Sequence, residues 1–189
     1  MGASLPAAGG ERSAGDVREV PVSVIVTIRD YTEADWPAVC RVHDVARVVE
    51  LAGGGVDARA YRCMAAVAEG DGFFDAKSLV ACLAGCVVGF VSWNGAYITW
   101  LYVDPARHRQ GIGRRLLRAA LAVIGPEAWT TALARNAAAR ALYEAAGMQV
   151  VFSEASDCEG YPYTNMRLAL PTSRMRNPAA QWPPRDGQA

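Results

Sequence analysis

Short apolar and β-branched runs recur along this chain, separated by residues that favour turns. Each run predicts a β-strand, and the runs cover residues 22–29, 79–83, 86–93, 96–103, 129–134, 149–153 and 163–170. Ala84-Gly85 joins the second run to the third as a hairpin. Asn94-Gly95 precedes the fourth run and predicts a type I′ turn. These three central strands are therefore expected to pair antiparallel.

Two helices are expected in the first third of the chain. Thr32 suits the N-cap of a helix that begins at Glu33, and the glycines of residues 53–55 end it. Asp57 suits the N-cap of a second helix, which carries apolar positions within residues 60–68.

A basic, glycine-spaced turn precedes a third predicted helix over residues 113–124, where apolar residues recur at i, i+3, i+4, i+7, i+8 and i+11. Gly111 and Gly113 let backbone N–H groups approach a ligand closely. The first turn of a helix adds unpaired N–H groups and the positive end of the helix dipole. The cationic side chains around this turn are His108, Arg109, Arg114 and Arg115. This composition predicts a phosphate site.

Two common phosphate-binding motifs do not fit this turn. A Walker-type loop needs Lys and then Ser or Thr after its glycines, and Arg114-Arg115 stand there instead. A dinucleotide fold needs three glycines after its first strand, whereas the turn has a single G-x-G after a late strand.

The turn instead resembles the phosphate signature of the GNAT superfamily of acetyl-CoA-dependent N-acyltransferases, Q/R-x-x-G-x-G/A. Residues 103–113 read VDPARHRQGIG, with His108 in the Gln/Arg position. Residues 136–148 read NAAARALYEAAGM and are similar to the family's N-x-x-A-x-x-x-Y-x-x-x-G-F/M helix. The resemblance extends from about residue 25 to about residue 170.

The resemblance implies a mixed α/β (α+β) fold. Its sheet is mostly antiparallel, with six or seven strands, splayed between strands four and five and covered by helices on both faces. It implies acetyl-CoA as co-substrate and no metal. It also implies that the acceptor pocket is shaped by the helices of residues 33–68 and the loop at 154–162. The implied CoA-binding residues are Leu101, Tyr102, Val103, His108, Arg109, Gln110, Gly111, Ile112, Gly113, Arg114, Asn136, Arg140 and Tyr143.

Asn136, Arg140 and Tyr143 share one helical face by their spacing of i, i+4 and i+7. The opposite stripe is small and apolar, suited to close packing: Ala138, Ala141, Leu142 and Ala145. By the resemblance, Asn136 contacts the pantetheine arm and Tyr143 faces the thioester sulfur. Tyr143 is the candidate catalytic acid, because a phenol pKa of about 10 exceeds the thiol's ~8.5. A helix N-cap for Asn136 and simple packing for Tyr143 are the structural alternatives.

The general base is not evident. Several family members place a Glu on the central strand, which by counting falls near Tyr97, and residues 97–103 carry no carboxylate. A bulge near Tyr102 and Val103 is expected to present backbone N–H groups to the thioester carbonyl and the pantetheine. Four carboxylates elsewhere are unranked candidates for the base: Glu50, Asp71, Glu154 and Glu159.

Composition limits the partners and the compartment. The formal net charge of the 189 residues is zero, which gives no reason to expect nucleic acid or an anionic membrane as partner. The five cysteines form no C-x-x-C pair, and reduced thiols in a cytoplasmic protein fit best. We expect a mobile extension over residues 1–21, one domain over 22–171 and a flexible tail over 172–189. A homodimer through the late strands is an expectation by analogy.

Three functions follow from these residues. The first is an N-acetyltransferase that acts on a primary amine of a small molecule or peptide. The second is a catalytically silent CoA-binding regulatory or sensor module, which the missing strand carboxylate would explain. The third is a general phosphate-binding protein without acyl chemistry.

Overall fold

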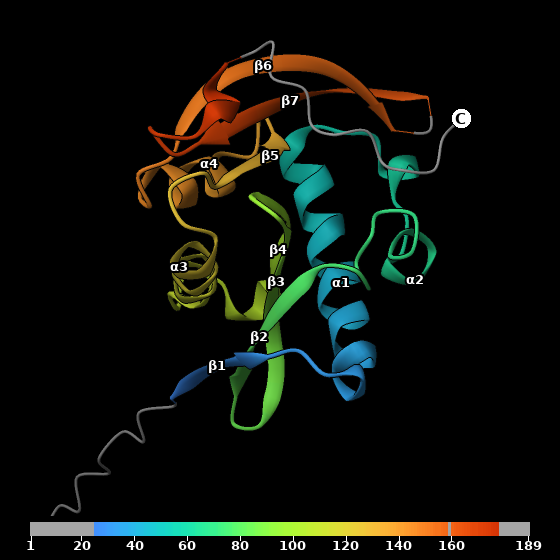
Figure 1. The fold of residues 1–189 in the computed structure, drawn as a ribbon. Coiled ribbons are helices and arrows are strands. Elements are labelled where there is room, and N and C mark those ends of the chain that lie inside the picture. The colour runs from blue at the N-terminus through green and yellow to red at the C-terminus, as the bar shows by residue number, and fades with distance from the viewer. Residues whose placement is uncertain (1–24, 159, 178–189) are drawn as a thin grey trace, which may run out of the picture.

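The chain folds around one sheet of seven strands, in the order β1-β2-β3-β4-β5-β7-β6 (Figure 1). The computed structural model describes residues 25–158 and 160–177. The strands are β1 (Val26–Asp30), β2 (Lys77–Leu83), β3 (Cys86–Asn94), β4 (Tyr97–Val103), β5 (Trp129–Leu133), β6 (Gln149–Cys158) and β7 (Tyr161–Ala169). The α-helices are α1 (Trp36–Gly54), α2 (Met64–Val67), α3 (Ile112–Ile124) and α4 (Ala137–Glu144). Short 3-10 turns are η1 (Glu33–Asp35), η2 (Ala58–Ala60), η3 (Pro105–Arg107) and η4 (Arg174–Arg176).

The sheet opens between β4 and β5, its one parallel pair in the described chain. These strands share two register pairs, Tyr97 with Trp129 and Ile98 with Thr130. Beyond Ile98 they diverge, which separates β1–β4 from β5–β7 (Figure 1). The predicted splay between the fourth and fifth strands is confirmed.

Helices cover both faces of the first half-sheet, as predicted. α3 lies on one face, and α1 with α2 lies on the other (Figure 1). Three residues of the apolar stripe predicted for α3, Leu116, Leu117 and Ala120, are buried against the strands, together with Ile112, which was not part of that stripe. On the opposite face, Val39 and Val42 of α1 pack with Phe90 of β3 and Trp100 of β4. β4 is therefore held from both sides.

A charged turn leads the chain from β1 into α1. Asp35 Oδ2 accepts hydrogen bonds from the Thr32 N–H at 2.9 Å and the Thr32 hydroxyl at 3.0 Å. The Arg29 guanidinium donates to both carboxylate oxygens of Asp35 at 2.7 Å. α1 ends at Gly54 and is capped by Gly55, whose φ of 67° is left-handed. The predicted start and end of this helix are confirmed to within a turn.

Residues 57–68 do not form the single helix predicted. The Asp57 carboxylate caps only the turn η2, and α2 begins separately at Met64. The Met64 N–H donates to Asp44 Oδ1 of α1 at 2.7 Å. A distant carboxylate thus caps α2, which local sequence signals could not indicate.

The first predicted hairpin turn, at Ala84-Gly85, is confirmed, and the second differs from the prediction. Asn94 is the last residue of β3, so the second loop consists of Gly95 and Ala96, and positive φ occurs only at Gly95 (56°). That is the pattern of a type II′ turn, and the predicted type I′ turn is wrong. Both central residues of the first hairpin, Ala84 and Gly85, have positive φ (49° and 80°), as in a type I′ turn.

The last two strands are longer than predicted. β6 and β7 continue their pairing through Ser156 with Tyr163 and Asp157 with Pro162, where a loop over 154–162 was expected. The register of β5 with β7 ends at Asn165. Pro162 therefore lies where β7 has no β5 partner, so its missing N–H removes no ladder bond on that side.

The packed part of the chain continues past residue 171. Met175 is buried against Trp129 and Ala169, and the Ser173 hydroxyl donates to the Glu127 carbonyl at 2.9 Å. Residues 1–21, the start of the first predicted strand and the end of the tail lie outside the described residues. Within residues 25–158 and 160–177, none of the helices combines the length and hydropathy needed to cross a membrane.

Candidate active site

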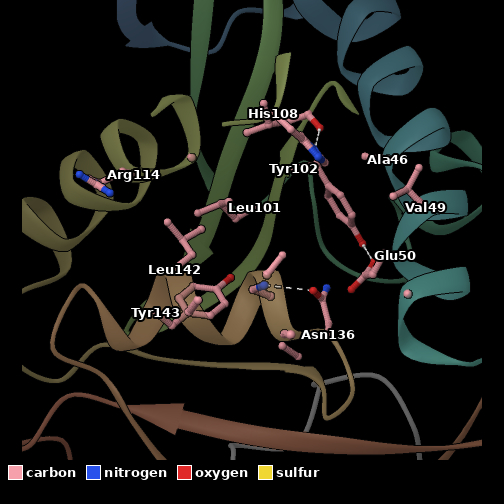
Figure 2. Close-up of a pocket in the computed structure, with 18 of the residues that line it drawn as sticks. Ala46, Val49, Glu50, Leu101, Tyr102, His108, Arg114, Asn136, Leu142 and Tyr143 are labelled. Carbon is pink, nitrogen blue, oxygen red and sulfur yellow. Dashed lines mark hydrogen bonds between the residues drawn. The ribbon is translucent and has the colours of Figure 1, made fainter. Parts of the chain in front are cut away.

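A pocket of about 750 Å³ opens where β4 and β5 diverge, and we call it the main pocket. Its walls come from β4, β5, the second half of α1, the start of α3 and α4 (Figure 2). Its volume lies within the range of roughly 300–1,000 Å³ that is usual for small-molecule sites.

The basic loop before α3 forms one wall of the main pocket. Arg109 and Gly111 both have left-handed backbone, with φ of 65° and 76°. The first helical hydrogen bond runs from the Arg115 N–H to the Gly111 carbonyl at 3.1 Å. The N–H groups of residues 112–114 therefore come before the first intrahelical hydrogen bond of α3. Arg107 and Arg114 line the same wall. Backbone donors, the positive end of the helix dipole and guanidinium groups thus lie together on one wall of the main pocket, an arrangement that suits an anion.

Hydrogen bonds fix this loop to β4 and α1. Asp104 Oδ1 accepts the Ala106 N–H at 3.0 Å, and Asp104 Oδ2 pairs with the Arg41 guanidinium of α1 at 3.0 Å. His108 Nε2 lies 3.1 Å from the Val103 carbonyl. The Asp-Pro step of the sequence motif therefore anchors the loop.

Asn136 and Tyr143 reach the main pocket from α4 (Figure 2). Asn136 Oδ1 accepts the Ala139 N–H at 3.0 Å, so its expected N-cap role is confirmed, and its side chain still lines the pocket. Tyr143 is buried in the core, and Figure 2 shows its hydroxyl pointing into the pocket. Burial raises the pKa of Tyr143 well above its ordinary value, against an opposing hydrogen bond with Thr130.

Most residues predicted to bind CoA line the main pocket: Leu101, Tyr102, Val103, His108, Arg109, Gly111, Ile112, Gly113, Arg114, Asn136 and Tyr143. Gln110 and Arg140 do not line it. Arg140 is exposed and pairs with Glu144 one turn along α4, with 2.8 Å between Nε and Oε1. Other lining residues were not predicted, including Ala46, Val49 and Gly53 of α1 and Thr130 and Thr131 of β5.

The small apolar stripe of α4 faces the main pocket rather than a packed neighbour. Ala138, Ala141 and Ala145 are exposed, and with Leu142 they line the pocket. The expected close packing is limited to Leu142, whose Cδ2 would lie 3.4 Å from a Cβ built on Gly113. Because the strands diverge beneath this stripe, no strand covers it.

The bulge of β4 lies earlier than predicted. The register of β3 with β4 shifts at Thr99, not near Tyr102 and Val103. The Thr99 hydroxyl donates to the Ser92 carbonyl at 3.0 Å and so satisfies an acceptor beside the irregularity.

A carboxylate reaches the main pocket from α1, although β4 carries none. Glu50 Oε2 accepts hydrogen bonds from the Tyr102 hydroxyl (Figure 2) and from Arg47 Nη1, each at 2.7 Å. Burial, and then the charge of Glu50, raise the pKa of Tyr102 well above its ordinary value. Glu50 and Tyr102 are 52 residues apart in sequence, so spacing could not rank Glu50 among the candidate bases.

A second cavity of about 240 Å³, the side pocket, adjoins the main pocket. Both pockets share six lining residues: Glu50, Thr99, Trp100, Tyr102, Thr131 and Ala132. The remaining walls come from α1, the segment from η2 past α2, β5 and β7: His43, Arg47, Ala60, Arg62, Val67, Asp71, Leu133, Tyr163 and Asn165. Burial lowers the pKa of His43, whose Nδ1 lies 2.9 Å from Asp44 Oδ1. The side pocket thus lies on the α1 side of β4.

The other candidate bases are less well placed. Asp71 lines only the side pocket. Glu154 is exposed on β6 and lines neither pocket, and Glu159 lies outside the described residues. Among the described residues, no three His, Cys, Asp or Glu side chains gather as a metal site.

Known structures share this fold. A GCN5-related N-acetyltransferase from Rhodopseudomonas palustris is 20% identical over 76% of this chain and 95% of its own, with a TM-score of 0.61. The ribosomal-protein-S18-alanine N-acetyltransferase of Escherichia coli is 22% identical over 79% and 95%, with a TM-score of 0.58. YncA from Salmonella typhimurium, solved with its cofactor acetyl-CoA, is 23% identical over 79% and 96%, with a TM-score of 0.55. No curated protein sequence matched the chain significantly.

The family comparison agrees with the two motifs and with the splayed sheet. The model of the acetyltransferase (GNAT) family matches residues 30–148, which is more than half of the chain. The protein belongs to the GNAT acetyltransferase family.

Proposed function

We propose that this protein transfers an acetyl group directly from acetyl-CoA to a primary amine of a small molecule or peptide. The observation that carries the proposal is the main pocket, where a basic loop, a splayed strand pair and Tyr143 meet on one cavity. We also propose that the protein is cytoplasmic, as its cysteine pattern led us to expect.

The residues of the main pocket fit the parts of CoA. Phosphates suit the loop before α3, where backbone donors lie among Arg107, Arg109 and Arg114. The pantetheine arm suits the space between β4 and α4, beside Asn136 and the alanine stripe. Its amide groups can pair with β4 beyond Ile98, where β5 supplies no partner.

Acetyl transfer needs a polarised carbonyl and a proton for the departing sulfur. Backbone N–H groups of β4 beyond the bulge can stabilise charge on the carbonyl oxygen, an effect commonly worth about 3 kcal/mol per donor. Tyr143 is protonated at neutral pH, because the ordinary pKa of a tyrosine is about 10 and burial raises it further. Its hydroxyl can then donate a proton to the sulfur as the carbon–sulfur bond breaks.

The test is turnover with acetyl-CoA and a mixed panel of small amines and peptides, followed by thiol release and by mass spectrometry of the acetylated product. We expect acetylation of at least one amine beyond the rate of thioester hydrolysis without acceptor. Tight CoA binding with no turnover of any amine would favour the silent regulatory or sensor module instead.

A further inference from the structure

Glu50 lies on the boundary between the two pockets. It is the carboxylate that lines both of them among the residues the structure describes. Tyr102 and Arg47 both bind its Oε2, which fixes the orientation of the carboxylate. Figure 2 shows Glu50 projecting from α1 toward Tyr102 at the edge of the main pocket. A nucleophile in the side pocket would pass Glu50 on its way to a thioester in the main pocket.

The side pocket is small and bears charges of both signs. Its volume of about 240 Å³ is below the range of roughly 300–1,000 Å³ that drug-sized ligands occupy. The titratable and charged groups that share it with Glu50 are His43, Arg47, Arg62, Asp71, Tyr102 and Tyr163. Such walls favour a small molecule with polar groups besides its amine.

An apolar cluster closes one end of the side pocket. It joins the end of α1 and the η2 segment to the β6–β7 hairpin, and its members are Leu51, Val56, Ala60, Tyr61, Leu133, Tyr161 and Tyr163. Three of these, Ala60, Leu133 and Tyr163, also line the side pocket. Arg59 lies over the Tyr161 ring, 5.1 Å from its centroid. Packed side chains therefore wall the side pocket at this end, which favours a small acceptor over an extended polypeptide.

We propose that the acetyl acceptor is a small polar amine held in the side pocket with its nitrogen against Glu50, which takes the ammonium proton. This assignment rests on the proposed function and names its acceptor class and its base. Glu50 thereby supplies from α1 the carboxylate that β4 lacks.

The step balances as follows. Glu50 takes one proton from the ammonium group, and the neutral amine nitrogen forms a bond to the thioester carbonyl carbon. The carbon–sulfur bond breaks, the sulfur keeps the electron pair, and Tyr143 protonates it. The second nitrogen proton returns to the Tyr143 oxygen, and the Glu50 proton passes to water. The products are the amide, free CoA thiol and one proton.

The first experiment compares small polar amines with peptides that bear a free N-terminal amine, using wild-type protein. We expect kcat/KM for the best small amine to exceed that for every peptide by at least tenfold. Equal or better turnover of a peptide would overturn the acceptor assignment while leaving the proposed function intact. Turnover of neither class would overturn the proposed function and this assignment with it.

The second experiment measures Glu50→Gln with the best acceptor between pH 6 and pH 10. At pH 7 we expect kcat/KM to fall by roughly 100-fold, within the usual range for general base catalysis. The loss should shrink with rising pH as hydroxide deprotonates the amine, and KM for acetyl-CoA should stay unchanged. A purely structural role would not produce this pH-dependent recovery.

Glu154→Gln is the matched control, because Glu154 is exposed and lines neither pocket. It should keep the wild-type pH profile. Thermal unfolding of both variants shows that they are folded, since glutamine can still accept the Tyr102 and Arg47 bonds. Wild-type kcat/KM at pH 7 in Glu50→Gln, or a loss that is equal at every pH, would overturn the role of Glu50.

Discussion

Tyr143 has two properties that bear on its proposed role as proton donor. Its ring lies in the core beside α3, and its hydroxyl points into the main pocket. Because burial raises its pKa, the hydroxyl keeps its proton well into the alkaline range. A falling rate between pH 7 and pH 10 would therefore not come from Tyr143.

Replacing Tyr143 with Phe tests the proton donor. The ring and its packing remain, so CoA affinity should stay nearly intact while kcat falls by roughly 100-fold. Steady-state kinetics together with calorimetric CoA titration separate the two effects. Unchanged kcat would mean that Tyr143 only packs and that water protonates the sulfur.

Alanine substitutions at two glycines of the basic loop are expected to affect the free energy of unfolding differently. Gly111 has a φ of 76° with open space around it, so Gly111→Ala should cost about 1 kcal/mol through backbone strain alone. Gly113 lies in the first turn of α3 without positive φ, and its added Cβ would meet Leu142 at an ordinary 3.4 Å. Gly113→Ala should therefore leave stability unchanged or slightly raised. Urea unfolding of both variants makes the comparison, and equal losses would contradict it.

Asp35, at the start of α1, is expected to make the stability of the fold depend on pH. Hydrogen bonds from Arg29 lower the pKa of Asp35 to about 2, below the ordinary carboxyl value of 3.8. The unfolded chain therefore takes up this proton first as the pH falls. The stabilisation by Asp35 is present above about pH 4 and is lost as the pH approaches 2.

Asp35→Asn should lower the free energy of unfolding by about 1–2 kcal/mol at pH 7. The difference from wild type should shrink between pH 4 and pH 2. Denaturant unfolding at stepped pH measures it, with the exposed Asp75→Asn as control. A difference that stayed constant down to pH 2 would show that Asp35 acts through shape rather than charge.

Helices and strands whose own residues carry a recognisable pattern could be predicted from the sequence. Those whose ends depend on contacts with distant residues could not. α3 followed from its apolar spacing because one face meets the sheet. α2 begins where Asp44 of α1 caps it, and the long β6–β7 pair depends on register with a neighbour, so neither had a signal in its own residues. The same holds for Glu50, whose place beside Tyr102 depends on how α1 crosses the sheet.

On the scale of the whole molecule, the main pocket spans both half-sheets. Its lining includes β4 from one half, and β5 and α4 from the other. Acetyl-CoA in this pocket would contact both halves and bind only the folded chain. The two sequence motifs predicted this ligand because they encode local backbone geometry. The proposed acceptor site is instead lined by α1, the segment around α2 and β7, which are far apart in sequence.

CoA should therefore raise the melting temperature. At a concentration of 100 times Kd the stabilisation is about 2.7 kcal/mol, which corresponds to roughly 5–10 °C for a domain of this size. ATP and NAD at the same concentration should shift it much less. Differential scanning fluorimetry compares the three, and equal shifts would support the general phosphate-binding protein instead.

Because β4 and β5 pair at only two positions, part of β4 is left without a neighbouring strand, and this matters for aggregation. Beyond Ile98, β4 presents a strand edge in the middle of the sheet rather than at its margin. Free strand edges at a margin recruit other chains and lead to aggregation. Here residues of α1, α3 and α4 line the pocket around this edge, which favours a slender ligand over a foreign strand with its side chains. The fold thus keeps an edge open for a small molecule without offering it to another protein.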